Sequence, residues 1–194
     1  EPKTRYFRAL ACLGAGDRAG YRATCQAMVE HYKFSQDPEV LRLTAWSVAL
    51  APGALESYKE LIDQLERVAP VVGGRFGHSY RFYLAAVLAR SGRYRDAVAE
   101  FEQIERRLAD TLGYSADFPE DGMHLLLSTC YAQLGDQEEG RKHLESGRKL
   151  RTGFRLRSFS LIAEQTATGY GRIRSLLEKE AESALSARFV KPPL

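Results

Sequence analysis

The chain has 194 residues, a net charge of +3, and a composition of 44% hydrophobic and 27% charged residues. These values are typical of a folded, soluble domain and exclude a disordered or fibrous chain. The small net charge gives no argument for nucleic-acid binding, and the apolar runs are much shorter than the roughly 20 residues of a membrane span. Three cysteines without a CxxC pair predict a reducing, cytoplasmic setting.

Apolar residues recur at helical spacing along almost the whole chain, and no segment shows the alternation of a half-buried strand. The sequence therefore predicts an all-α fold. Asp37, followed by Pro38 and Glu39, predicts one helix start, because an aspartate caps backbone N–H groups and proline fits the first helical position. In chain order, we expect helices over 3–14, 18–32, 38–51, 54–69, 78–91, 94–112, 120–134 and 137–151, with one or two more between 156 and 189.

A glycine stands in each of four predicted turns between neighbouring helices. Gly16, Gly53, Gly92 and Gly135 are separated by 37, 39 and 43 residues. A short turn after a helix end favours glycine, because glycine adopts a positive φ without steric cost. Helix pairs at such a period are typical of a solenoid. We expect four pairs over residues 1–155, with one or more capping helices and a tail over 156–194 that belong to the same domain.

The segment 78–111, "HSYRFYLAAVLARSGRYRDAVAEFEQIERRLADT", resembles the tetratricopeptide repeat (TPR), a 34-residue helix–turn–helix unit. Leu84 and Ala85 stand at the repeat's Leu-Gly pair. The turn and the second helix then match through Gly92, Tyr94, Ala97 and Phe101. A second unit from 121 matches through Tyr131 and Gly135, with Gly140 in place of the repeat's alanine.

The resemblance implies a right-handed superhelix and a non-catalytic scaffold or adaptor that binds a protein or peptide partner. The stretches "AGDRAGYRATCQAMVEHY" and "DPEVLRLTAWSVALAPGA" are similar to helical-repeat C-terminal regions of large bacterial signalling proteins, which commonly follow a Ser/Thr kinase domain or a β-propeller. The chain is therefore expected to be a regulatory part of a longer protein. Its start, which lacks a methionine and a secretory core, favours the same expectation.

In TPR proteins the first helix of each pair lines the concave groove that holds the ligand. The family's groove positions fall here on Ser79, Phe82, Ala86 and Ala89, and on Gly122, Leu125, Thr129 and Ala132. These small and apolar residues favour an amphipathic helix or an extended peptide with a few hydrophobic anchors. The alternative is that Phe82 and Leu125 pack against neighbouring helices instead.

A second candidate surface is basic. The segment 141–157 holds Arg141, Lys142, Arg148, Lys149, Arg151, Arg155 and Arg157 against a single Glu145. Such a run suits phosphate groups or an acidic partner segment, or it is an ordinary solvated helix face. Nucleic acid is the less favoured of these binding partners, because few aromatic residues interrupt the run and base stacking is poorly supported. A homodimer or a structural spacer is a further alternative.

Motifs for chemistry are missing from the sequence. His31, His78, His124 and His143 have no metal-ligand spacing to one another or to a cysteine. The acidic runs are typical of solvated helix faces, and no phosphate loop or nucleophile motif occurs. The sequence therefore predicts no enzymatic activity, no cofactor and no metal site.

Overall fold

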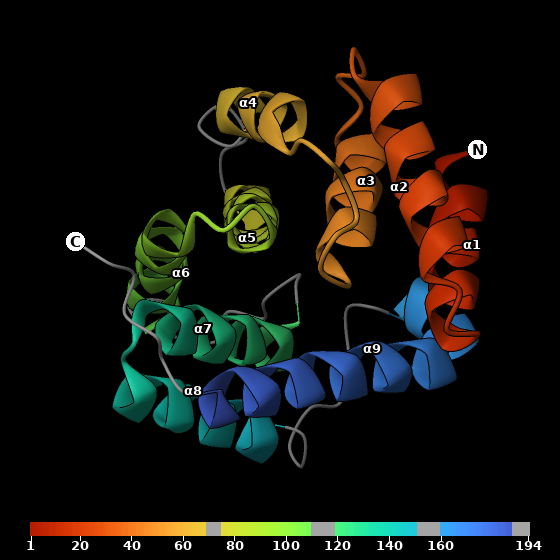
Figure 1. The fold of residues 1–194 in the computed structure, drawn as a ribbon. Coiled ribbons are helices and arrows are strands. Elements are labelled where there is room, and N and C mark those ends of the chain that lie inside the picture. Colours follow the sequence, from red (N-terminus) through yellow and green to blue (C-terminus); the bar gives the residue numbers. More distant parts are fainter. Residues whose placement is uncertain (69–74, 110–118, 151–159, 188–194) are drawn as a thin grey trace.

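The computed structural model describes residues 1–68, 75–109, 119–150 and 160–187. Every regular element in these ranges is an α-helix, as the sequence predicts (Figure 1). The helices are α1 Pro2–Gly14, α2 Arg18–Tyr32, α3 Pro38–Ala49, α4 Lys59–Val68, α5 Arg75–Arg90, α6 Tyr94–Ala109, α7 Glu120–Leu134, α8 Gln137–Leu150 and α9 Ser160–Ser186. None of these described helices combines the length and the apolar character that a membrane crossing requires.

The predicted turn glycines are confirmed by the backbone. Gly16, Gly53, Gly92 and Gly135 have φ values of 74°, 72°, 83° and 88°, and no other residue in the described part of the chain has a positive φ. A residue with a Cβ is strained at such angles. The roughly 40-residue period in the sequence therefore follows from a repeated backbone requirement.

The fourth predicted helix starts later than expected. Residues 54–58 are not helical, and α4 begins at Lys59 instead of residue 54. Ala54 and Leu55 are buried in the core, and the Lys59 backbone N–H points to the Ser57 hydroxyl at 3.4 Å. The Ile62 backbone N–H donates to the Tyr58 carbonyl oxygen over 3.0 Å, which is the first hydrogen bond of α4. α4 packs against α5 and not as a hairpin partner of α3, so the expected third and fourth helices do not form a pair.

The odd-numbered helices form a cycle of contacts. α1 contacts α3, α3 contacts α5, α5 contacts α7, α7 contacts α9, and α9 returns to contact α1 (Figure 1). The even-numbered helices pack on this set: α2 on α1 and α3, α6 on α5 and α7, and α8 on α7 and α9. The last helix, α9, thus contacts the first helix, α1, and closes the cycle.

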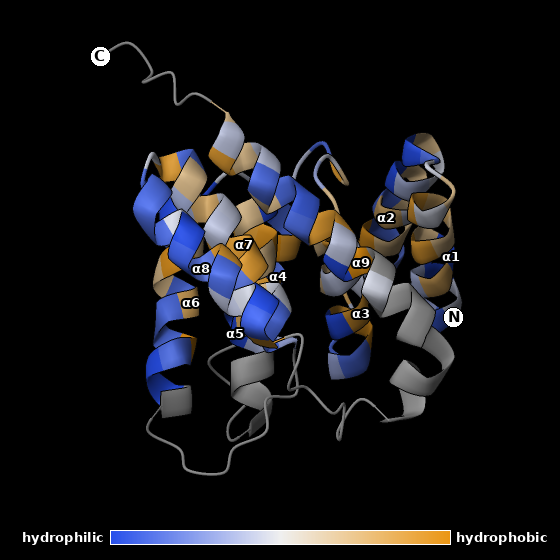
Figure 2. Cartoon of the chain, turned by 90° about the horizontal axis from the view of Figure 1, so that it is seen from below, coloured by the Kyte–Doolittle hydropathy of each residue, from blue (hydrophilic) through white to orange (hydrophobic). Residues whose placement is uncertain are grey.

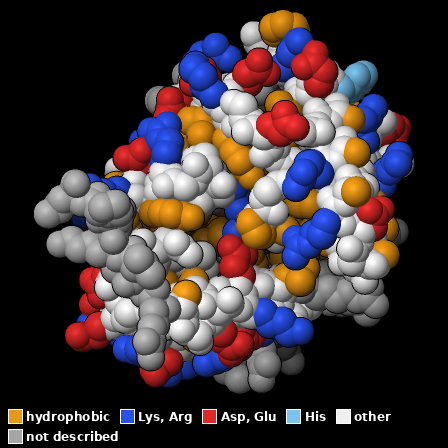
Figure 3. Space-filling view, in the orientation of Figure 1, with side chains coloured by type: hydrophobic (Ala, Val, Ile, Leu, Met, Phe, Trp, Pro, Cys, Tyr) orange, Lys and Arg blue, Asp and Glu red, His pale blue; other side chains and the backbone are white. Residues whose placement is uncertain are grey.

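The core is apolar and follows the odd-numbered helices. α7 is apolar around most of its circumference, with nine of its residues buried, whereas α8 buries only Gly140, Leu144 and Gly147 and is mostly hydrophilic (Figure 2). Hydrophobic side chains also gather in the middle of the face drawn in Figure 3, with acidic and basic side chains around them. A helix that is apolar all round is surrounded by protein, and α7 contacts α5, α6, α8 and α9.

The residues that carry the repeat resemblance lie at helix contacts. Ala97 and Phe101 are fully buried, and Tyr94 and Tyr131 are partly buried against the core. Gly140 lies where a Cβ would come within 2.8 Å of Leu185 and 3.2 Å of the Ser128 carbonyl oxygen. The absence of a side chain at residue 140 therefore lets α8 approach α7 and α9 closely.

Candidate functional site

The predicted peptide groove is largely covered. Phe82, Ala86 and Leu125 are completely buried, and the rings of Phe82 and Phe101 lie 6.1 Å apart between their centroids. The physical reason is that neighbouring helices cover these positions: Phe82 packs against Trp46 of α3 and Phe101 of α6, and Leu125 lies against Gly147 of α8. These three residues belong to the core, which corrects the groove prediction. The side chain of Ser79 lies outside the described residues.

Two residues of the predicted groove, although buried, line a pocket that we call the α7–α9 pocket. It has a volume of about 360 Å³. Ala89 and Thr129, both from the predicted groove positions, reach it from α5 and α7. Leu126 and Gln133 add to the α7 wall, and α9 supplies the opposite wall with Glu180, Ser183, Ala184 and Ala187.

Two of the residues that line this pocket form an ion pair. Arg90, at the end of α5, pairs with Glu180 of α9, and its Nε donates a hydrogen bond to the Ala49 carbonyl oxygen over 2.8 Å. Burial by itself lowers the pKa of Arg90. The neighbouring Glu180 carboxylate raises it by more, so the pKa of Arg90 lies above its usual value. Arg90 therefore stays charged and fixes α9 relative to α5 and to the end of α3.

Residues 141–150 are the part of the predicted basic run that the structure describes, and carboxylates lie next to most of their positive charges. Lys142 lies 2.6 Å from Glu139 and 3.1 Å from Glu138, and Arg148 pairs with Glu178 and Glu182 of α9. Lys149 lies 4.0 Å from Glu145, and Arg141 is exposed. Arg151, Arg155 and Arg157 lie outside the described residues. Residues 141–150 are therefore not an unopposed positive surface, because carboxylates of α8 and α9 lie among their charges.

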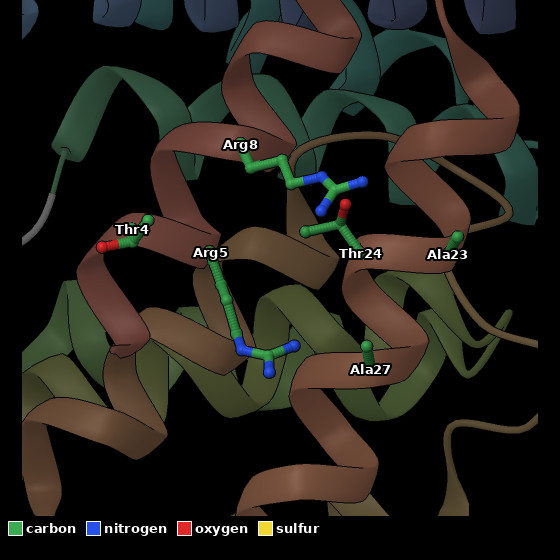
Figure 4. A pocket seen from close by; sticks show the side chains of 6 residues that line it. All are labelled: Thr4, Arg5, Arg8, Ala23, Thr24 and Ala27. Carbon is green, nitrogen blue, oxygen red and sulfur yellow. The ribbon is translucent and has the colours of Figure 1, made fainter.

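A second pocket lies between α1 and α2 and contains two arginines (Figure 4). Thr4, Arg5 and Arg8 come from α1, and Ala23, Thr24 and Ala27 from α2, around a volume of about 330 Å³. Figure 4 shows the two guanidinium groups extending into the space between the helices. We call this the α1–α2 pocket; sequence reasoning did not select it, since Arg5 and Arg8 are not part of a basic run.

Three potential metal ligands also meet between α6, α7 and α8. The Nδ1 atoms of His124 and His143 are 2.9 Å apart, and the Glu105 Oε1 lies 3.5 Å from the first and 3.9 Å from the second. Tyr131 stacks on the ring of His143, with centroids 5.3 Å apart, and its hydroxyl donates to Glu102 over 2.9 Å. We call Glu105, His124 and His143 the His–His–Glu cluster.

Burial shifts the titration of the cluster. It lowers the pKa of His124 to about 4, with a contribution from the neighbouring His143, and it lowers the pKa of His143 as well. Burial also raises the pKa of the Glu105 carboxyl, together with the nearby Glu102. Both imidazoles are therefore neutral at pH 7, and their contacts with Glu105 are not ion pairs at that pH.

The sequence contains a weak signal for this cluster, although its histidines do not have the spacing of a metal-binding motif. His124 and His143 lie on either side of the turn at Gly135, at 11 and 8 residues from it. In an antiparallel helix pair, residues at similar distances from the turn lie at similar heights. Glu105 comes from another helix pair, so only the packing of α6 on α7 could place it.

Comparisons with known proteins give no neighbour for this chain: no family model, no curated protein and no solved structure matches it.

Proposed function

We propose that this chain is a non-catalytic protein-interaction module, built of TPR-like helix pairs in a right-handed superhelix, and that it serves as a regulatory arm of a larger bacterial signalling protein. Its ligand is a short segment of a partner protein that inserts an apolar side chain into the α7–α9 pocket. Gly16, Gly92 and Gly135, with positive φ at the turns of the α1–α2, α5–α6 and α7–α8 pairs, support the repeated helix pairs.

The observation that carries the proposal is the position of Ala89 and Thr129. The resemblance assigns both to the ligand-facing side of the first helices, and both line the α7–α9 pocket while Phe82 and Leu125 are covered. The walls combine methyl and leucine side chains with Thr129, Gln133 and Ser183. A pocket of this composition holds an apolar anchor, and its few polar groups orient the backbone of the bound segment.

A second candidate function is the binding of an acidic partner segment in the α1–α2 pocket. Arg5 and Arg8 lie one helical turn apart on α1, beside the small residues Ala23 and Ala27 of α2. Two guanidinium groups beside small side chains suit a carboxylate or phosphate group, which arginine binds with two parallel hydrogen bonds. This candidate replaces the basic run, whose described charges already have acidic neighbours.

The two candidates are separated by selecting peptides from a displayed random library at low and at high salt. Ala184→Trp fills the α7–α9 pocket from the α9 side, and Ser175→Trp places the same side chain on an exposed position of the same helix. We expect peptides with apolar anchors that bind at both salt concentrations, because apolar burial is not screened by salt. These peptides should be lost with Ala184→Trp and retained with Ser175→Trp.

Circular dichroism first establishes that both variants are folded. Peptides with acidic residues that are lost in high salt and with Arg5→Glu/Arg8→Glu would move the function to the α1–α2 pocket. If folded wild-type protein enriches no peptide at either salt concentration, the interaction module is contradicted.

A further inference from the structure

We propose that the His–His–Glu cluster is a binding site for a divalent transition-metal ion, with Zn²⁺ as the best-fitting ion and with Glu105, His124 and His143 as its protein ligands. The site connects α6, α7 and α8, and it is separate from both pockets above. Metal binding requires no partner protein, so its test is independent of the interaction proposed for the pockets.

The distances in the cluster have the scale of a coordination sphere. The two Nδ1 atoms and the Glu105 Oε1 form a triangle with sides of 2.9, 3.5 and 3.9 Å. A point slightly above the plane of this triangle, where a tetrahedral ion lies, is about 2.1 Å from all three atoms, within the range of zinc–nitrogen and zinc–carboxylate bonds. The ligand atoms therefore need no rearrangement of the helices to reach one ion.

The ligand types select the kind of ion. Two imidazole nitrogens and one carboxylate oxygen are ligands typical of Zn²⁺ and of neighbouring first-row metals, whereas Mg²⁺ and Ca²⁺ take oxygen ligands. Three protein ligands leave a tetrahedral ion one further position for a water molecule. The side chains of His124, His143 and Glu105 are 18%, 15% and 32% exposed, so solvent reaches the cluster.

Electrostatics favour a cation at the same point. A neutral imidazole carries one N–H, so at 2.9 Å one Nδ1 donates to the other, which presents its lone pair. The Glu105 oxygen, at 3.5 and 3.9 Å, is too far for a good hydrogen bond from either ring. A bound cation replaces this hydrogen bond: the shared proton moves to Nε2 of its ring, and both Nδ1 lone pairs and the Glu105 carboxylate then face the ion.

Tyr131 supports the arrangement from the other side. Its ring lies nearly parallel to that of His143, at 10°, and its hydroxyl is held by Glu102. A ligand whose ring is fixed by packing and by hydrogen-bonded neighbours loses little freedom when the metal binds. The orientation of His143 is therefore prepared before the ion arrives.

The test is a titration of chelator-treated protein with ZnCl₂ by isothermal calorimetry, with CoCl₂ absorption as a second readout. We expect one ion per chain, and a visible absorption band for Co²⁺ with the intensity of a four-coordinate site. His124→Ala and His143→Ala should each weaken Zn²⁺ binding by about 100-fold or more, and the isosteric Glu105→Gln by about 10-fold. MgCl₂ should give no heat of binding.

His31→Ala is the matched control, because His31 is an exposed histidine on α2, away from the cluster. It should bind Zn²⁺ like the wild type. Since Glu105→Gln preserves the size of a partly exposed side chain, its effect does not depend on an alanine variant remaining folded. The proposal is overturned if wild-type protein takes up no Zn²⁺ at about 100 μM, or if His31→Ala weakens binding as much as the cluster variants do.

Discussion

The two ends of the helix series use their charged residues in different ways. In α1–α3, the described ion pairs are local: Lys33 pairs with Glu30 and Arg42 with Glu39, each three residues apart on the chain. In α7–α9, ion pairs join different helices. Arg174 of α9 lies 2.9 Å from Asp121 of α7, and Arg148 of α8 pairs with α9.

The N-terminal helices are joined by a neutral group instead. The Tyr21 hydroxyl donates to the Ser47 carbonyl oxygen over 2.8 Å and accepts from the Ala51 N–H over 3.1 Å, so α2 holds the end of α3. Buried charges are costly to separate from their partners, whereas exposed pairs contribute little. The attachment of α9 therefore depends on a few buried charges, whereas Arg5 and Arg8 of α1 line a pocket between α1 and α2.

The largest effect is expected from Asp121→Ala. The side chains of Arg174 and Asp121 are only 10% and 12% exposed. Removing the carboxylate leaves a buried guanidinium without its main partner, and such a loss costs about 3 to 5 kcal/mol of unfolding free energy. Urea unfolding followed by circular dichroism measures it. The Glu178 carboxylate, 3.6 Å from Arg174, moderates the loss toward the lower end.

The matched control for this prediction is Glu30→Ala in the N-terminal region. Glu30 is 70% exposed and pairs only within α2, so its removal should cost less than about 0.5 kcal/mol. A double variant, Asp121→Leu with Arg174→Met, should recover most of the stability that Asp121→Ala loses, because it leaves no buried charge. Equal losses for Asp121→Ala and Glu30→Ala would remove the contrast between the two regions.

An intermediate effect is expected from Tyr21→Phe. Tyr21 is 1% exposed, and the substitution keeps the ring while it removes the hydroxyl. The Ala51 N–H and the carbonyl oxygens near the end of α3 then lose a buried partner, which costs about 1 to 3 kcal/mol. The same urea titration measures the loss. A change below about 0.5 kcal/mol would indicate that packing alone joins α2 to α3.

The sequence predicts most of the helix positions and all four glycine turns, because both depend on local chemistry. Gly16 and Gly92 mark turns that only glycine adopts without strain, and Asp37 caps α3 by accepting from the Glu39 N–H at 2.9 Å. The start of α4 was predicted at residue 54 but lies at Lys59, because Ala54 and Leu55 are buried in the core although their backbone is not helical.

The candidate sites could not be obtained in the same way, because they depend on which helices meet. α7 is apolar around most of its circumference, so periodicity does not separate a ligand-facing Leu125 from a core Leu125. The packing of α8 on α7, with Gly147 against Leu125, decides that question. The His–His–Glu cluster likewise needs three helices from two pairs, and no spacing within one helix contains it.

The smallest effect is expected from Arg148→Ala. This variant tests whether an ion pair between two helices stabilises the fold even when it is exposed to solvent. Arg148 reaches Glu178 and Glu182 of α9, but its side chain is 43% exposed. Solvent screens such a pair, so the loss should be below about 1 kcal/mol and should shrink further at high salt. Urea unfolding at two salt concentrations measures both quantities. A loss as large as that of Asp121→Ala would mean that the connection of α8 to α9, and not the burial of the charge, determines the stability of this end of the molecule.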